Sequence, residues 1–195
     1  QLHLDLWVDG LNLLRDMGSF AYYDPPLKRN LKFSSTAMHN TVEIDGQNQM
    51  IKGPRFYWIR LSKGHVERAD ETSLRASHDG YARLGVGHTR EVQAGDTCWV
   101  VRDHLAVCGT HTAVLRWFLP KLPATLDGNT LTIETPSGPA SLTITADAPI
   151  ELQLREEQES LTYGQLSPVW VLETTAQLSA DATLETTLQL PPLSE

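Results

Sequence analysis

The sequence lacks the features that mark several classes of protein. It has two cysteines in 195 residues, too few for a disulfide framework or a zinc-finger spacing. No run of about 18 apolar residues is present, so no membrane span is expected. Acidic side chains outnumber basic ones by 24 to 16, and the resulting net charge of −8 argues against nucleic acid as a partner.

The two cysteines, Cys98 and Cys108, both lie in strand-like sequence. We expect them to be small buried hydrophobic residues, with a cross-strand disulfide as the alternative. The cysteine count does not decide the redox compartment. For the full-length parent protein the bacterial periplasm is favoured, and the cytoplasm stays open.

Helical periodicity is nearly absent, and its best candidate, residues 70–76, is very short. Apolar and polar residues instead alternate with a period of two, first over residues 2–8 and up to a hairpin signal at Asp9-Gly10. The partner strand of this hairpin is expected at 11–16, and further strands at 41–45, 57–68, 89–92, 98–103, 113–119, 124–126, 131–134, 141–146, 150–154, 169–173 and 182–190. The pattern predicts an all-β fold, a large antiparallel two-sheet β-sandwich of the supersandwich kind, as one domain over residues 1–195.

The residues suited to chemistry are concentrated in the first two thirds of the chain. Residues 1–119 contain all seven histidines, whereas residues 120–195 are rich in Thr, Leu and Pro. A long irregular loop at residues 17–40 interrupts the strands, and such loops are more often functional than decorative. We therefore expect residues 1–119 to carry any site and residues 120–195 to supply scaffold strands.

Three short motifs give the sequence a resemblance to a known family. They are the Arg-Asp-x-Gly turn at residues 15–18, the Ala-x-His-Asn-Thr element at 37–41 and His-Asp-Gly-Tyr at 78–81. Residues 2–120 resemble the C-terminal β-sandwich of the heparinase II/III-like family, which includes bacterial polysaccharide lyases. The resemblance implies an upstream (α/α) toroid domain, which is absent from this chain, and a cleft between the two domains that binds an acidic, uronic-acid polysaccharide.

The resemblance also implies the reaction of the parent protein. A base removes the proton at C5 of the uronate, and an acid protonates the departing oxygen at C4, which is β-elimination. The family's catalytic tyrosine lies in the helical domain, so this chain is expected to hold no catalytic residue and to be inactive alone. If the sandwich is instead purely structural, the face left without the helical partner is expected to cause self-association of the isolated chain.

A metal site is the further implication of the resemblance. The family has a His-x-His-x-Asp element whose second histidine binds zinc with an aspartate and another histidine. Aligning on the first hairpin puts that element just upstream of residue 1 and the other ligands at Asp16 and His39, residue types that suit zinc. With one ligand missing, zinc is expected in the full-length protein and absent or weakly held here. His3 and Asp5 share a strand face and are a separate cation-binding pair to consider.

Each candidate residue has a structural alternative. Asp16 could form the turn at Gly18, and His39 could be a hydrogen-bonded histidine at the start of a strand. The candidates for the substrate cleft are Arg29, Asn40, His78 and Tyr81. Two alternatives to the lyase remain for the chain as a whole, a non-catalytic carbohydrate-binding sandwich and a purely structural one.

Overall fold

The computed structural model describes residues 1–21, 29–54 and 57–192, without the side chains of residues 29 and 30. The described elements are almost all strands, and the short helices lie in the connections. The helical turns are α1 (Arg29–Phe33), η1 (Thr36–Met38) and η2 (Ala82–Leu84). The strands are β1 (Leu6–Val8), β2 (Leu11–Leu14), β3 (Val42–Ile44), β4 (Ile51–Lys52), β5 (Trp58–Arg60), β6 (Gly64–Ala69), β7 (Ser73–His78), β8 (Val86–Ala94), β9 (Cys98–Val107), β10 (His111–Pro120), β11 (Ala124–Asp127), β12 (Thr130–Thr135), β13 (Gly138–Ala146), β14 (Ile150–Glu159), β15 (Ser167–Leu178) and β16 (Ala182–Gln189).

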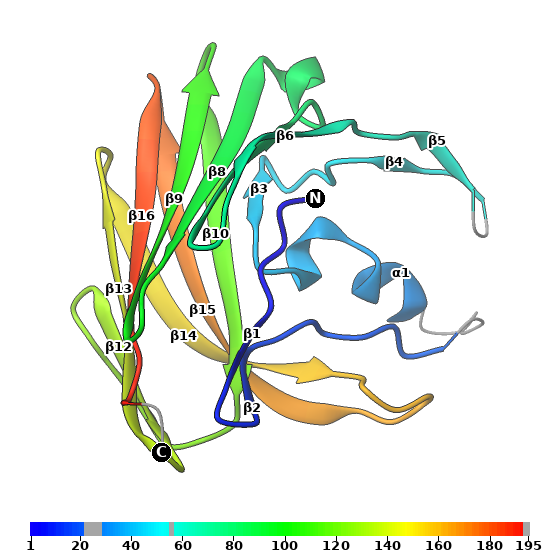
Figure 1. Cartoon of the computed structure of the whole chain (residues 1–195). Helices are drawn as coiled ribbons and strands as arrows, with labels where there is room; N and C mark the ends of the chain where they lie inside the picture. Colours follow the sequence, from blue (N-terminus) through cyan, green and yellow to red (C-terminus); the bar gives the residue numbers. More distant parts are fainter. Residues whose placement is uncertain (22–28, 55–56, 193–195) are drawn as a thin grey trace.

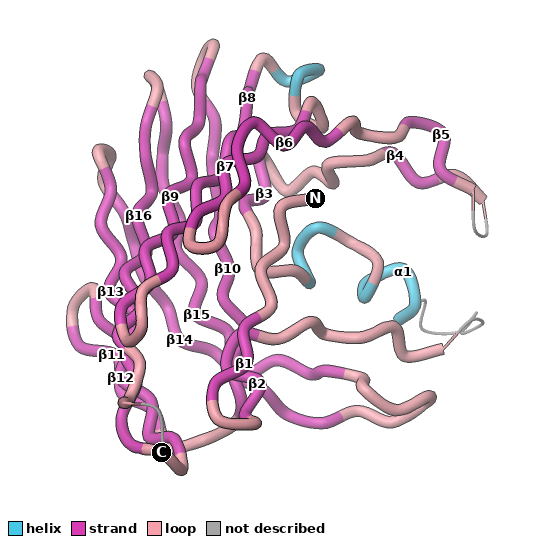
Figure 2. Tube along the Cα trace, in the orientation of Figure 1, coloured by secondary structure: helices cyan, strands magenta, loops and turns pink. Residues whose placement is uncertain are grey.

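Two antiparallel sheets form the body of the molecule (Figure 1). The larger sheet has the strand order β11-β12-β13-β16-β9-β8-β7-β6, and the smaller has the order β14-β15-β10-β3. Two further hairpins, β1-β2 and β4-β5, lie outside these sheets, and Figure 2 shows β4-β5 extending away from them. The all-β, antiparallel, sandwich-like prediction is therefore confirmed.

The main core lies between the two sheets because both present alternate apolar residues to each other. On β10 the inward side chains Leu115, Trp117 and Leu119 are fully buried. The Trp117 indole N–H donates a 3.0 Å hydrogen bond to the hydroxyl of Thr186 on β16, so the two sheets are joined by a polar contact as well. A buried Trp satisfied in this way combines a large apolar area with a fixed orientation.

A second apolar cluster covers the opposite face of the smaller sheet. It consists of Met17, Phe20, Phe33, Met38, Phe118, Val169 and Val171. Phe118 points away from the main core, since it neighbours Trp117 on β10, and this explains why β10 is buried on both faces. The cluster anchors the described parts of the long loop, and a 2.7 Å ion pair from Lys32 to Glu157 fixes α1 at the same face.

Some expectations about individual segments are wrong. The single strand expected at 57–68 is divided into β5 and β6, and residues 73–78, for which no strand was expected, form β7. Cys98 and Cys108 are exposed and unpaired, because Cys98 lies on the outward side of β9 and Cys108 follows the end of that strand. None of the helices in the described ranges is long and apolar enough to span a membrane.

Gly18 is the residue that brings the start of the long loop against the smaller sheet. Its φ is +75°, and it forms a bridge with Ser160, the residue after β14. A Cβ at this position would lie 2.0 Å from the Ser160 carbonyl oxygen, closer than any real contact. The position therefore needs glycine for two reasons, the left-handed backbone and the close approach.

We predict that Gly18→Ala destabilises the fold more than Gly10→Ala. Gly10 has nearly the same φ, +76°, but nothing lies within 4 Å of its Cβ position, so its variant bears only the backbone strain of about 1 kcal/mol. Gly18→Ala adds displacement of the Ser160 backbone. Urea unfolding of the two variants measures the difference, and equal losses of unfolding free energy would contradict the steric account.

Candidate cation-binding site

Three side chains from separate segments converge beside the first hairpin. Asp16 follows β2, His39 follows η1, and His3 precedes β1. The Asp16 carboxylate oxygen Oδ2 lies 3.0 Å from His39 Nδ1 and 3.8 Å from His3 Nε2. The predicted convergence of Asp16 and His39 is thus present, and His3 joins them as a third group.

The donor atoms of this cluster fit a tetrahedral cation in type and spacing. Two ligand atoms that each lie about 2 Å from a tetrahedral zinc ion are about 3.3 Å apart, and the two observed distances fall on either side of that value. His3 Nε2 is buried without a hydrogen-bond partner among the described residues. The side chains are 24% (His3), 31% (His39) and 44% (Asp16) exposed, so a small ion can reach them.

The tautomer of His3 in the structure is unfavourable for cation binding, because its proton lies on the nitrogen that faces Asp16. The Asn40 backbone N–H donates a 2.9 Å hydrogen bond to His3 Nδ1, which leaves the proton of the neutral ring on Nε2. Coordination through Nε2 requires the other tautomer and therefore costs the Asn40 hydrogen bond. Histidine ligands are normally supported by an acceptor at the second nitrogen, so the affinity of this site is expected to be lowered.

Burial and neighbouring charges set the ionisation of the cluster. Burial lowers the pKa of His3 to about 4, although Asp16 acts in the opposite direction. For Asp16, burial raises the pKa, but hydrogen bonds from His39 and the Gly18 amide outweigh it, so its pKa is lowered. At neutral pH the cluster is an anionic carboxylate beside a neutral His3, which is the state that a cation binds.

Asp16 both forms the turn at Gly18 and contributes to the cluster, the two roles that the sequence left open. Its Oδ1 accepts a 2.7 Å hydrogen bond from Gly18 N–H, and its Oδ2 faces His39. The turn therefore aims the second oxygen at the cluster. Asp5 Oδ2 accepts the Asp16 N–H at 3.3 Å and so supports the turn from β1's side.

The expectation paired His3 with Asp5, because the alignment puts the His-x-His-x-Asp element upstream of residue 1, whereas the structure brings His3 beside Asp16 and His39. The donor atoms of His3, Asp16 and His39 all lie within 4.8 Å of one another. The signal was present in the sequence, since His3 and Asp5 have the spacing of the last two members of that element.

Three of the four cleft candidates lie inside the molecule, namely Asn40, His78 and Tyr81. Asn40 is fully buried and its side chain binds three backbone groups, those of Leu4, Arg15 and Phe118. Tyr81 is also fully buried, donates to the Val42 and Gln47 carbonyls, and has its pKa raised by burial, so it remains a neutral phenol. Arg29 begins α1, but its side chain lies outside the described residues.

His78, the remaining candidate, is the first member of a buried polar chain. Gly80 N–H donates to His78 Nδ1, His78 Nε2 lies 3.0 Å from His88 Nδ1, and His88 Nε2 lies 2.7 Å from Asp103 Oδ1. Because each acceptor fixes the next donor, both imidazoles carry their proton on Nε2. Burial lowers the pKa of His78 to about 3 and also lowers that of His88.

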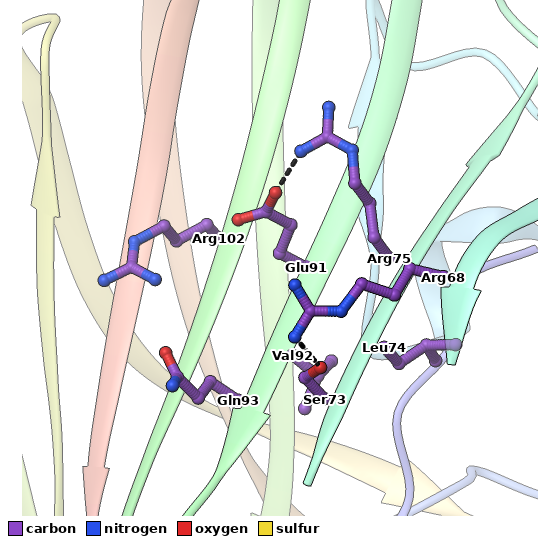
Figure 3. Close-up of a pocket in the computed structure, with 8 residues that line it drawn as sticks. All are labelled: Arg68, Ser73, Leu74, Arg75, Glu91, Val92, Gln93 and Arg102. Carbon is purple, nitrogen blue, oxygen red and sulfur yellow. Dashed lines mark hydrogen bonds and ion pairs between the residues drawn. The ribbon is translucent and has the colours of Figure 1, made fainter. Parts of the chain in front are cut away.

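A hollow on the outer face of the larger sheet is a second place where a ligand could bind (Figure 3). It has a volume of about 170 Å³ and is lined by Arg68, Ser73, Leu74, Arg75, Glu91, Val92, Gln93 and Arg102. Each of its arginines has an acidic partner: Arg68 pairs with Asp70, Arg75 with Glu67 and Glu91, and Arg102 with Glu185. The hollow is therefore a cross-strand ladder of alternating charge, and we do not assign it a ligand.

Comparison with known proteins identifies the family. The family model described as heparinase II/III-like, C-terminal, matches residues 1–185, so this chain belongs to that family. A search of curated proteins found no match.

Similar solved structures have the same fold. A mutant of the heparan sulfate lyase HepC from Pedobacter heparinus has a TM-score of 0.81 at 17% identity, over 99% of this chain and 30% of that one. A heparinase III gene product has a TM-score of 0.77 at 16% identity (97% and 30%), and another heparinase III has 0.75 at 19% (95% and 29%). The chain thus spans about 30% of the length of these proteins.

We predict that the buried histidines make the fold sensitive to acid. The folded-state pKa of His78 is about 3, against an ordinary value of 6.5, so the unfolded chain takes up this proton first as the pH falls. The contribution of neutral His78 to the free energy of unfolding is fully present above about pH 6.5. Between pH 6.5 and pH 5 this residue alone lowers the free energy of unfolding by about 2 kcal/mol. Urea unfolding at pH 7 and pH 5 should show a smaller loss for His78→Gln than for wild type; equal losses would contradict the assignment.

Proposed function

We propose that this chain is the β-domain of a polysaccharide lyase that cleaves a uronic-acid polysaccharide by β-elimination. It would form one wall of the substrate cleft beside a helical domain. Membership of the heparinase II/III-like family supports this function. The observation that carries it is the convergence of His3, Asp16 and His39 at a partly exposed position.

The division of the reaction between two domains follows from the chemistry. Removal of the C5 proton requires a base within hydrogen-bond reach, an acid at the leaving oxygen and positive charge or donors at the uronate carboxylate. Tyr81 is not suited to be the base, because it is buried and its pKa is raised. We infer that the base comes from the helical domain and that this chain supplies structure and charge at the cleft wall.

We further propose that the cluster holds zinc. His3 Nε2, Asp16 Oδ2 and His39 Nδ1 would be the protein ligands, and the ion when bound would supply a fixed positive charge that ties β1, β2 and the long loop together. This places His3 at the second histidine and Asp5 at the aspartate of the His-x-His-x-Asp element. Gln1 then stands at the first histidine of that element, and an amide there can donate a hydrogen bond but cannot act as an acid or base.

A second role, docking onto the rest of the parent protein, is favoured by the β4-β5 arm. Tyr57, Ile59 and Leu61, in and beside β5, are 74%, 72% and 66% exposed, and this much exposed apolar surface is uncommon on a free hairpin. Since similar solved chains are about three times as long, we propose that the missing helical domain covers this arm. The same surface supports the expectation that the chain alone self-associates.

We predict that the wild-type chain binds one zinc ion. Asp16→Asn and His3→Gln should each weaken zinc binding by at least about 10- to 100-fold, which is the loss of metal affinity that follows removal of a residue supporting a ligand. His111→Gln is the matched control, because His111 also pairs with an aspartate, Asp45, but lies away from the cluster. Titration against a chromogenic chelator measures the affinities. Equal affinities for all four proteins would exclude this cluster as the zinc site.

We predict that the isolated chain releases no unsaturated uronate from heparan sulfate or alginate, whereas the full-length parent does on one of these or a related polymer. The reason is that a general acid and base must lie within hydrogen-bond reach of the same sugar. Ultraviolet absorbance of the unsaturated product follows the reaction. Turnover by the isolated chain, abolished by a substitution within it, would place the catalytic groups here and overturn the division.

A further inference from the structure

The segments that carry His3 and His39 are held by the same buried guanidinium. One nitrogen of Arg90, Nη1, donates 2.6 Å hydrogen bonds to the carbonyl of Leu2 and to the carbonyl of Asn40. Leu2 directly precedes His3, and Asn40 directly follows His39. Arg90 therefore contacts the backbone beside two members of the cluster without contacting their side chains.

The Leu2 backbone indicates that this contact resists strain. Its φ is +55°, in the left-handed region that a leucine rarely adopts. Such a conformation is unfavourable for a residue with a Cβ and persists where surrounding contacts hold it. The Leu2 carbonyl bond to Arg90 is a contact of this kind, and it sets the direction in which the chain enters His3.

Arg90 is itself fixed on its other side. Its Nε and Nη2 donate to the two carboxylate oxygens of Asp103, at 2.7 and 2.8 Å, and its guanidinium lies 5.1 Å from the centre of the Trp117 ring. His88 Nε2–H donates to the same Asp103, and His78 holds His88. Both members of the ion pair are buried, with side-chain exposures of 3% and 0%.

We propose that Arg90 is a positioning residue for the His3–Asp16–His39 cluster, and that the Asp103–His88–His78 chain fixes Arg90 for this role. The inference rests on the proposed cation site for its functional meaning. The guanidinium uses four hydrogen bonds in one plane, two to a carboxylate and two to backbone carbonyls. A lysine keeps the charge but has one nitrogen and cannot make all four.

The test compares Arg90→Lys with Arg116→Lys. Arg116 is the matched control because it is also nearly buried and bridges two carboxylates, Glu43 and Glu173, but on the opposite face of β10. Zinc affinity should fall about 10- to 100-fold in Arg90→Lys and stay unchanged in Arg116→Lys. Wild-type affinity in Arg90→Lys would overturn the proposal.

A second measurement separates this proposal from the zinc site. Amide exchange of Asn40, whose N–H donates to His3 Nδ1, reports the cluster without metal. In Arg90→Lys this amide should lose protection while the amide of Ile144 in β13, far along the larger sheet, keeps it. If wild type binds no zinc, the zinc proposal fails, and loss or retention of Asn40 protection still supports or overturns the positioning role.

A gentler variant covers the case in which Arg90→Lys does not fold. His88→Gln leaves Arg90 and Asp103 in place but removes the imidazole that orients the carboxylate. It should reduce zinc affinity and Asn40 protection in the same direction by a smaller factor. Unchanged values for both in a folded His88→Gln protein would overturn the role of the supporting chain.

Discussion

The buried ion pair between Arg90 and Asp103 is the interaction on which the rest of the structure depends. It joins β8 to β9 inside the larger sheet, faces Trp117 of the smaller sheet, and reaches two carbonyls of the segments outside both sheets. Removing one partner of such a pair leaves an uncompensated buried charge, at a cost of about 3–5 kcal/mol. The pair is therefore a constraint on geometry first and a source of stability second.

Asn40 transmits that constraint to the cluster. Its backbone N–H meets His3, its backbone carbonyl meets Arg90, and its side chain binds the Leu4 and Arg15 carbonyls and the Phe118 amide. A buried amide with all these groups satisfied costs little desolvation and permits one arrangement. The long loop, the first strands and β10 are thus held in register at one residue, directly beside His39.

The sheets follow from residues close together in sequence, and the site does not. The alternation along residues 2–8 and the Asp9-Gly10 turn were sufficient to predict β1, β2 and the all-β class, because side chains in a strand alternate between faces. The Arg15–Gly18 and Ala37–Thr41 motifs led to Asp16 and His39. His3 was expected to bind a cation with Asp5, because side chains two residues apart share a strand face, whereas the folded chain brings it to Asp16 and His39.

Other features depend on contacts that no local pattern encodes. The His78–His88 contact arises from the register of β7 on β8, in which these residues are opposite each other, and Asp103 joins from β9. The left-handed Leu2 has no sequence signal, since leucine is disfavoured there and the Arg90 contact that holds its carbonyl is distant in sequence. The exposure of Cys98 depends on which face of β9 turns inward, which its short apolar run left open.

The most direct test of the account is X-ray absorption spectroscopy at the zinc edge on the zinc-loaded chain. The account predicts nitrogen and oxygen ligands at about 2.0–2.1 Å with the scattering of two imidazoles, and one imidazole fewer in His3→Gln. A ligand shell without imidazole, or a shell that His3→Gln leaves unchanged, would contradict the claim that His3, Asp16 and His39 together hold the ion.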